Sequence, residues 1–184
     1  MADSNVTLRA AELLQTARSA DLLLPDPTAL RDAEGERRAA TMVEAAFLLA
    51  AADGHLEAQE LGELTSLLSE VLGGSLTPGQ TATHLEAFQD TLEREGKSAR
   101  IAAIAAAATS PEERRELLGF ASLVALCDDD LAPAELFVLH SLGRAFGLKT
   151  EDVNGIVRGV REALAVAAVA SDAAPEAVPE KRQG

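Results

Sequence analysis

The sequence contains one internal repeat, in which residues 47–61 align with residues 122–136 at an offset of 75 positions. In each copy an apolar stretch with helical spacing runs into an acidic turn, and a second helical stretch begins just after it. The repeat predicts two units of helix, acidic turn and helix that pack about a pseudo-two-fold axis. A leucine in each turn is expected to anchor it in the core. Identical residues carry the match: Asp53 with Asp128, Leu56 with Leu131, Glu60 with Glu135, and Leu61 with Leu136.

Start and stop signals divide the rest of the chain into helices. Thr77 and Ser110 each stand before a proline, with Gln80 and Glu113 three positions on, which is the pattern of a capped helix start. No stretch alternates convincingly at period two, so no sheet is expected. The predicted fold class is all-α, with about seven helices in one compact bundle. The predicted helices cover residues 6–24, 34–52, 57–72, 77–95, 98–109, 110–127, 133–147 and 150–170.

Prolines and small polar residues separate this bundle from both ends of the chain. Pro25 and Pro27 end the first amphipathic stretch, so residues 1–33 are expected to form an N-terminal helix and a linker. Residues 34–170 form the predicted helical domain. Residues 171–184 contain two prolines among small and charged residues, and we expect them to be a disordered tail.

Charge narrows the classes of partner. The chain has 30 acidic and 16 basic residues, and its formal net charge is −14. A field of this sign repels phosphate backbones and anionic membrane surfaces, so nucleic-acid binding is not expected. The same field attracts cations and basic protein surfaces, although solubility alone also explains an acidic composition.

The sequence also bears on location. The N-terminal residues show neither the basic segment nor the apolar core of a signal peptide. The longest apolar runs, residues 101–108 and 163–170, are too short to span a bilayer, so no direct membrane insertion is expected. Cys127 is the only cysteine, which fits a reducing compartment. We therefore expect the protein in the cytoplasm.

The acidic turns contain the candidate metal ligands. A carboxylate at Glu60 or Glu135 suits the first turn of a helix, but Ala132 cannot supply the side-chain half of a capping box. The three successive aspartates of residues 128–130 face the negative pole of the preceding helix and repel one another. A bound cation would relieve this repulsion, and carboxylate oxygens suit Ca²⁺, Mg²⁺ or Mn²⁺. The predicted metal ligands are Asp53, Glu60, Asp128, Asp130 and Glu135.

The alternative is a structural role, in which the acidic turns cap helices, no metal binds and the domain is an adaptor for protein assembly. An EF-hand is excluded, because counting from Asp128 places Pro133 where that loop requires glycine. The sequence has no metalloprotease, phosphate-loop or serine-hydrolase motif, and no nucleophile or base accompanies the carboxylates. We expect a binding protein and not an enzyme, with a divalent cation as the one cofactor to consider.

The pattern Asp-Gly-x-Leu-x-x-x-Glu, present from Asp53 to Glu60 and echoed from Asp128 to Glu135, resembles the TerB-like family of tellurite-resistance proteins. The resemblance covers roughly residues 34–165. It implies a duplicated, all-helical fold with an acidic, metal-binding surface. It also implies a role in stress response, with other proteins as partners in a complex at the cytoplasmic membrane. The chain departs from the family pattern at Asp129, which replaces the glycine of the second copy.

Overall fold

The computed structural model describes residues 30, 32–54, 56–72, 76–126 and 131–172. Over these residues the regular structure consists of seven α-helices, and no strand occurs. The predicted all-α class is therefore confirmed, whereas the predicted helix over residues 6–24 and residues 173–184 of the predicted tail lie outside the described residues. The helices are α2 (Ala33–Ala50), α3 (Ala58–Val71), α4 (Pro78–Glu95), α5 (Lys97–Ala107), α6 (Pro111–Ala125), α7 (Pro133–Ala145) and α8 (Thr150–Asp172).

Local capping chemistry explains where two of these helices begin. The hydroxyl oxygen of Thr77 accepts a hydrogen bond from the Gln80 amide at 3.2 Å, and Gln80 Oε1 accepts one from the Thr77 amide at 2.8 Å. Ser110 and Glu113 form the same reciprocal pair at the start of α6. Such pairs satisfy N–H groups that a helix start otherwise leaves without partners. Both predicted start signals are confirmed.

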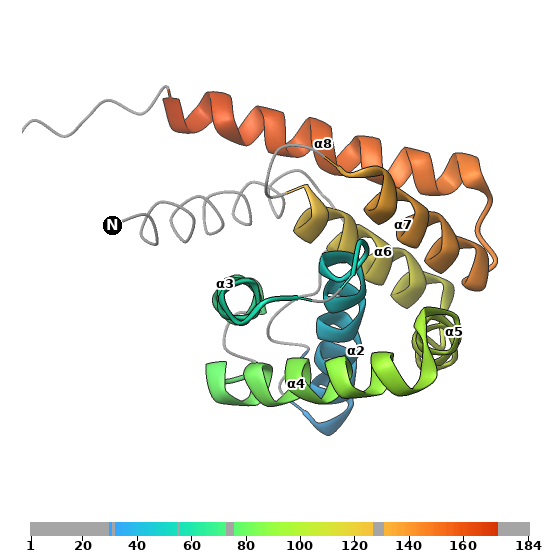
Figure 1. The fold of residues 1–184 in the computed structure, drawn as a ribbon. Coiled ribbons are helices and arrows are strands. Elements are labelled where there is room, and N and C mark those ends of the chain that lie inside the picture. The colour runs from blue at the N-terminus through green and yellow to red at the C-terminus, as the bar shows by residue number, and fades with distance from the viewer. Residues whose placement is uncertain (1–29, 31, 55, 73–75, 127–130, 173–184) are drawn as a thin grey trace, which may run out of the picture.

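The helix α2 lies at the centre of the bundle (Figure 1). It packs against α4, α5, α6 and α7, and so joins the first half of the chain to the second. The helices α6, α7 and α8 lie side by side, and α3 packs on α4. Figure 1 shows α4 crossing α2 on the side opposite α8.

The hydrophobic core is centred on α2 and α6. Phe47 on α2 and Phe120 on α6 are the largest side chains that are fully buried. Most of their buried neighbours are leucine, alanine and valine, which release apolar surface from water on folding. Small buried residues such as Ala45 and Ala121 allow the two helices to approach closely. The sequence therefore builds its core from many small contacts with few aromatic rings.

At three positions the structure requires glycine, either for its backbone conformation or for the lack of a side chain. Gly96, with φ 79°, joins α4 directly to α5, and Gly147, with φ 78°, follows the end of α7. Glycine adopts this left-handed region without steric cost. Gly143 is needed for packing, because an added Cβ would lie 2.3 Å from Cγ2 of Val153, where α7 meets α8.

The observed helix ends differ from the predicted ones by at most two residues. Differences of this size are expected, since the last turns of helices fray and often change geometry. Across the described segments, no helix combines the length and the apolar character needed to cross a membrane.

Candidate functional site

The first acidic turn follows the C-terminal end of α2. The Ala51 amide donates to the Phe47 carbonyl oxygen at 2.8 Å and closes the last helical turn. The Gly54 amide then donates to the Ala51 carbonyl oxygen at 3.3 Å, which reverses the chain. Asp53 lies within this turn and is exposed. Its carboxylate is therefore accessible from solvent.

A leucine anchors each acidic turn. Leu56 exposes only 6% of its surface, and Leu131, at the equivalent place in the second copy, is partly buried against the same core. Burial of a leucine side chain contributes about 1.5–3 kcal/mol when it is complete. The expected anchoring role of the leucine is confirmed for the first turn and is weaker in the second.

The two predicted glutamate ligands perform the same local task. Glu60 Oε2 accepts a hydrogen bond from the Glu57 amide at 2.7 Å, and Glu135 Oε2 accepts one from the Ala132 amide at 2.8 Å. Each carboxylate thus satisfies the backbone N–H three positions before it, at the start of α3 or α7. Ala132 contributes no side-chain bond in return, as expected for alanine. Half of a capping box is therefore enough to give both glutamates a structural role.

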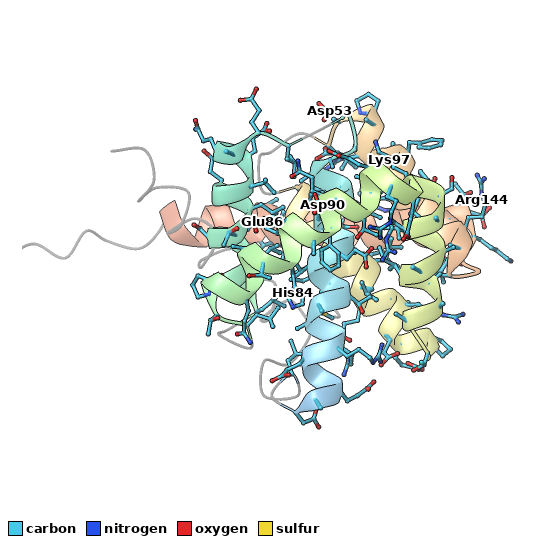
Figure 2. The ribbon with its side chains drawn as sticks, turned by 60° about the horizontal axis from the view of Figure 1, so that its bottom comes forward. Asp53, His84, Glu86, Asp90, Lys97 and Arg144 are labelled. Atoms are coloured by element: carbon cyan, nitrogen blue, oxygen red, sulfur yellow. The ribbon has the colours of Figure 1, made fainter. Side chains whose placement is uncertain are left out.

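Lys97 supplies a positive charge at the first acidic turn. From the first residue of α5, its ammonium group donates a hydrogen bond to the carbonyl oxygen of Ala52. Figure 2 shows Lys97 and Asp53 at the same end of the molecule. Sequence reasoning missed Lys97, because 45 positions separate it from Ala52 and no motif marks it.

An open pocket of about 380 Å³ lies beside the same turn. This volume falls within the range of small-molecule sites and also suits a side chain from a partner. The lining combines apolar groups with one cation, Lys97, and one carboxylate, Glu93. The pocket is lined by Phe47, Ala51, Gly54, Leu56, Gln89, Leu92, Glu93, Gly96 and Lys97.

Comparison with known families identifies the domain that contains these features. The family model of tellurite resistance protein TerB matches residues 39–158. The chain belongs to the TerB family. The match begins within α2 and ends within α8, so it includes both acidic turns of the TerB domain. No curated protein and no solved structure matches the chain significantly. The resemblance inferred from the acidic pattern is confirmed.

The metal ligands predicted for this TerB domain divide into two groups. Asp53, Glu60 and Glu135 lie on the turn and helices described above, whereas Asp128 and Asp130 are outside the described residues. Among the residues that the structure does describe, no group of three or more His, Cys, Asp or Glu side chains is placed to hold a metal ion. The five-residue metal site remains a prediction.

A buried ion pair joins α2 to α5 within the TerB domain. Arg100 Nε donates to Glu44 Oε1 at 2.6 Å, and Arg100 Nη1 donates to Glu95 Oε2 at 2.8 Å. Burial raises the pKa of Glu44, although the Arg100 guanidinium opposes the effect. Hydrogen bonds from Arg100 and Arg94 lower the pKa of Glu95. Arg100 of α5 thus links Glu44 of α2 with Glu95 of α4, and Glu44 is not part of the acidic turn.

Arg38 forms a second link, from α2 to α6. Its Nε lies 3.4 Å from Glu113 Oε1, and its Nη2 is paired with Glu116 Oε2. Burial raises the pKa of Glu116 against the effect of Arg38. Burial also acts to raise the pKa of Glu113, but hydrogen bonds from Thr109 and Ser110 outweigh it and lower that pKa. The two arginines fix α2, which carries the first acidic turn at its end.

Proposed function

We propose that this TerB-family chain is a binding module without enzymatic activity, which holds a divalent cation at its acidic turns and docks other proteins in a stress-response system. The observation that carries the proposal is the family match, which spans both turns. The exposure of Asp53 and Glu60 supports it, because surface carboxylates are accessible to an ion and to a partner. The acidic net charge adds attraction for cations.

The proposal treats α2–α3–α4 and α6–α7–α8 as duplicated units. Two of the three equivalent helix pairs support this: α2 contacts α4 as α6 contacts α8, and α3 contacts α4 as α7 contacts α8, whereas α6 packs on α7 more closely than α2 packs on α3. The helices α2 and α6 also pack against each other, as expected close to a pseudo-two-fold axis. The equivalent amide bonds of Glu60 and Glu135 are a further point in favour.

The proposed ligands offer only carboxylate oxygens, which are the donors that Ca²⁺, Mg²⁺ and Mn²⁺ prefer. Glu60 engages one carboxylate oxygen with the Glu57 amide, and its exposed side chain retains a second oxygen for an ion. The cation would offset the repulsion among the aspartates of residues 128–130. The proposed ligand set is Asp53, Glu60, Asp128, Asp130 and Glu135.

Calorimetric titration with Ca²⁺, Mg²⁺, Mn²⁺ and Zn²⁺ tests this proposal. We expect the wild type to bind at least one of the three hard cations. The double variant Glu60→Gln, Glu135→Gln should bind it at least about tenfold more weakly, because the charges of two ligands are lost. A glutamine can still accept the amide bond, as Gln80 does at the start of α4, so the helix starts are kept.

A matched control removes two negative charges elsewhere. Glu86 and Asp90 are exposed on α4 (Figure 2), and neither belongs to the proposed ligand set. The variant Glu86→Gln, Asp90→Asn should bind the cation as the wild type does. Equal responses of the wild type and the Glu60→Gln, Glu135→Gln variant to all four cations would show that the metal proposal is wrong.

The second candidate function is an adaptor domain that binds no metal. The capping bonds of Glu60 and Glu135 and the contact of Lys97 with Ala52 favour it, since they explain three charged groups without an ion. A cation that binds only the folded state raises the melting temperature. If the domain is an adaptor without a metal site, none of the four cations should raise it. Replacing both glutamates by alanine would then cost about 1 kcal/mol for each lost cap, whereas glutamine would preserve stability.

The proposal places the protein in the cytoplasm, with other proteins as its partners in a complex at the membrane. The excess of acidic residues supports protein or cation partners over nucleic acid. The absence of a membrane-spanning helix among the described residues is compatible with a peripheral member of such a complex.

A further inference from the structure

The outer face of α7 presents an aromatic ring to solvent. Phe137 exposes 72% of its surface, whereas Phe47, Phe120 and Phe146 are buried. The neighbouring Leu136 is also exposed, at 36%. Exposure of a large apolar side chain costs the folded state the burial energy that the other phenylalanines contribute. Aromatic side chains are enriched in protein–protein interfaces relative to the rest of a protein surface, so an exposed Phe137 is a candidate contact residue for a partner.

Basic residues follow Phe137 along the same face of α7. His140 and Arg144 stand three and seven positions after it, and this spacing places the three side chains on one stripe of a helix. Arg144 is exposed and lies at the edge of the molecule in Figure 2. At a rise of 1.5 Å per residue, Phe137 and Arg144 are about 10 Å apart along the helix axis.

The stripe ends at an open pocket of about 540 Å³ between α7 and α8. Its lining contains three basic residues and a single carboxylate, Glu151, together with apolar groups. Thr150 and Glu151 are the first residues of α8, and their backbone N–H groups have no acceptor within the helix. The pocket is lined by His140, Arg144, Leu148, Lys149, Thr150, Glu151 and Val153.

Several other described cations of the chain have an internal partner for the side chain. Arg38 and Arg100 pair with carboxylates, and Lys97 bonds a backbone carbonyl. The side chains of Arg144 and Lys149 make no ion pair or hydrogen bond with any described residue. The lining of this pocket therefore carries two cationic groups against one carboxylate, next to an exposed aromatic ring, in a chain whose formal net charge is −14.

We propose that Phe137, His140, Arg144 and Lys149 form a docking surface for an acidic protein segment with an apolar anchor. The anchor packs on Phe137, and carboxylates about two helical turns away pair with Arg144 and Lys149 at the pocket. The acidic remainder of the chain repels such a segment elsewhere, so charge fixes its place and register. This α7 docking surface rests on the docking half of the proposed function and does not require the cation.

Fluorescence anisotropy with synthetic peptides tests the α7 docking surface on the full chain. The probe is a labelled helical peptide of about 15 residues, a length at which an isolated helix becomes marginally stable. It carries leucines on one stripe and glutamates beside them, and a second peptide has glutamine at every glutamate. All titrations contain EDTA, so the result is independent of the cation titration. We expect the acidic peptide to bind at least about tenfold more tightly than the glutamine peptide.

Two variants probe the two ends of the surface. Phe137→Ala and the double variant Arg144→Gln, Lys149→Gln should each weaken binding of the acidic peptide about tenfold, the first through lost apolar contact and the second through lost charge. The control is Arg115→Gln, Arg161→Gln, which removes two exposed cations outside the surface and should bind as the wild type does. Circular dichroism should give closely similar melting temperatures for all of these chains, because each substituted side chain is exposed.

The proposal is overturned if the wild type binds both peptides equally or neither, or if the surface variants bind as the control does. Vesicles containing phosphatidylserine provide a further arm. If the wild type binds these vesicles and Arg144→Gln, Lys149→Gln abolishes that binding while the peptides stay unbound, the surface belongs to a membrane and the proposal is wrong. None of these outcomes alters the cation titration, so the two proposals can fail separately.

Discussion

At the scale of single residues, Glu44 is a charged side chain that the fold buries on α2. Its side chain is 9% exposed and meets the guanidinium of Arg100, which is 17% exposed. Removing two charges from water costs several kcal/mol for each ion, and good geometry only repays that cost. The pair therefore adds little net stability while it is intact. Removing only one of the two partners leaves the other as a buried charge without a counter-charge.

The variant Arg100→Met should lower the free energy of unfolding by about 3 kcal/mol, because Glu44 then keeps its burial and loses its partner. Urea denaturation measures the change. The double variant Glu44→Met, Arg100→Met should recover most of it, since two apolar side chains of similar volume fill the site. The control Arg94→Met removes an arginine that is 67% exposed and should have little effect. Equal losses for Arg100→Met and Arg94→Met would contradict this account.

Residue-scale reasoning from the sequence located the acidic turns but gave the glutamates too weak a structural role. Ala132 seemed to argue against capping, yet a backbone amide needs only an acceptor, and Glu135 supplies it without help from the alanine side chain. Lys97 and Arg100 were missed for a different reason. Their partners Ala52 and Glu44 are 45 and 56 positions away, and only the folded bundle brings them together.

At the scale of helices, the contact of α7 with α8 depends on one missing side chain. Gly143 and Val153 approach so closely that an added Cβ would meet Val153 Cγ2 at 2.3 Å. Val153 is itself 1% exposed, and its branched side chain has few ways to move aside. Because α7 presents the α7 docking surface and α8 begins at its pocket, the same contact sets the geometry of both.

The variant Gly143→Ala should destabilise the fold by about 1–3 kcal/mol, as overpacking does in other cores. Combining it with Val153→Ala should return part of that loss, since the clashing methyl groups are removed. Gly155→Ala is the matched control on α8: nothing lies within 4 Å of its added Cβ, and alanine should stabilise a helix interior by about 0.5–1 kcal/mol. Thermal denaturation should show a lower melting temperature for Gly143→Ala and a higher one for Gly155→Ala than for the wild type. A stabilising Gly143→Ala would refute the packing argument.

The order of the helices was largely predictable, because short local sequence signals mark where several of them begin. Thr77 with Gln80 and Ser110 with Glu113 form the expected capping boxes. Packing was less accessible, since the sequence does not state that α2 contacts four other helices or that Gly143 faces Val153. The α7 docking surface was also missed. No sequence pattern sets Phe137 apart from the other apolar residues of α7, and only its exposure distinguishes it.

At the scale of the whole molecule, the carboxylates with shifted pKa values make stability depend on pH in opposing ways. Burial raises the pKa of Glu44 and of Glu116 above their ordinary value of 4.5. Hydrogen bonds lower the pKa of Glu95 and of Glu113. A carboxyl group with a raised pKa binds its proton more readily in the folded state, so it adds stability as pH falls through that pKa. A carboxyl group with a lowered pKa binds its proton less readily in the folded state, so the folded state loses stability as pH falls through that pKa.

Comparison of the wild type with Glu44→Gln, Glu116→Gln isolates the first effect. As pH falls from neutral toward 4.5, the wild type should gain stability relative to the variant, whose amides do not titrate. Urea denaturation at several pH values measures the difference between the two free energies of unfolding. If that difference is constant over this range, or if the wild type loses stability relative to the variant on acidification, the assigned directions are wrong.

The junction at Gly96 gives the molecule an unusual sensitivity to chain length. One residue separates α4 from α5, and the first turn of α5 holds both Lys97, which reaches the acidic turn, and Arg100, which reaches Glu44. One extra residue at the start of α5 would rotate the following side chains by about 100° about the helix axis. The bond of Lys97 to Ala52 and the pair of Arg100 with Glu44 would then be lost together. Relatives that keep this arrangement should tolerate insertions in their longer connections and resist them at this glycine.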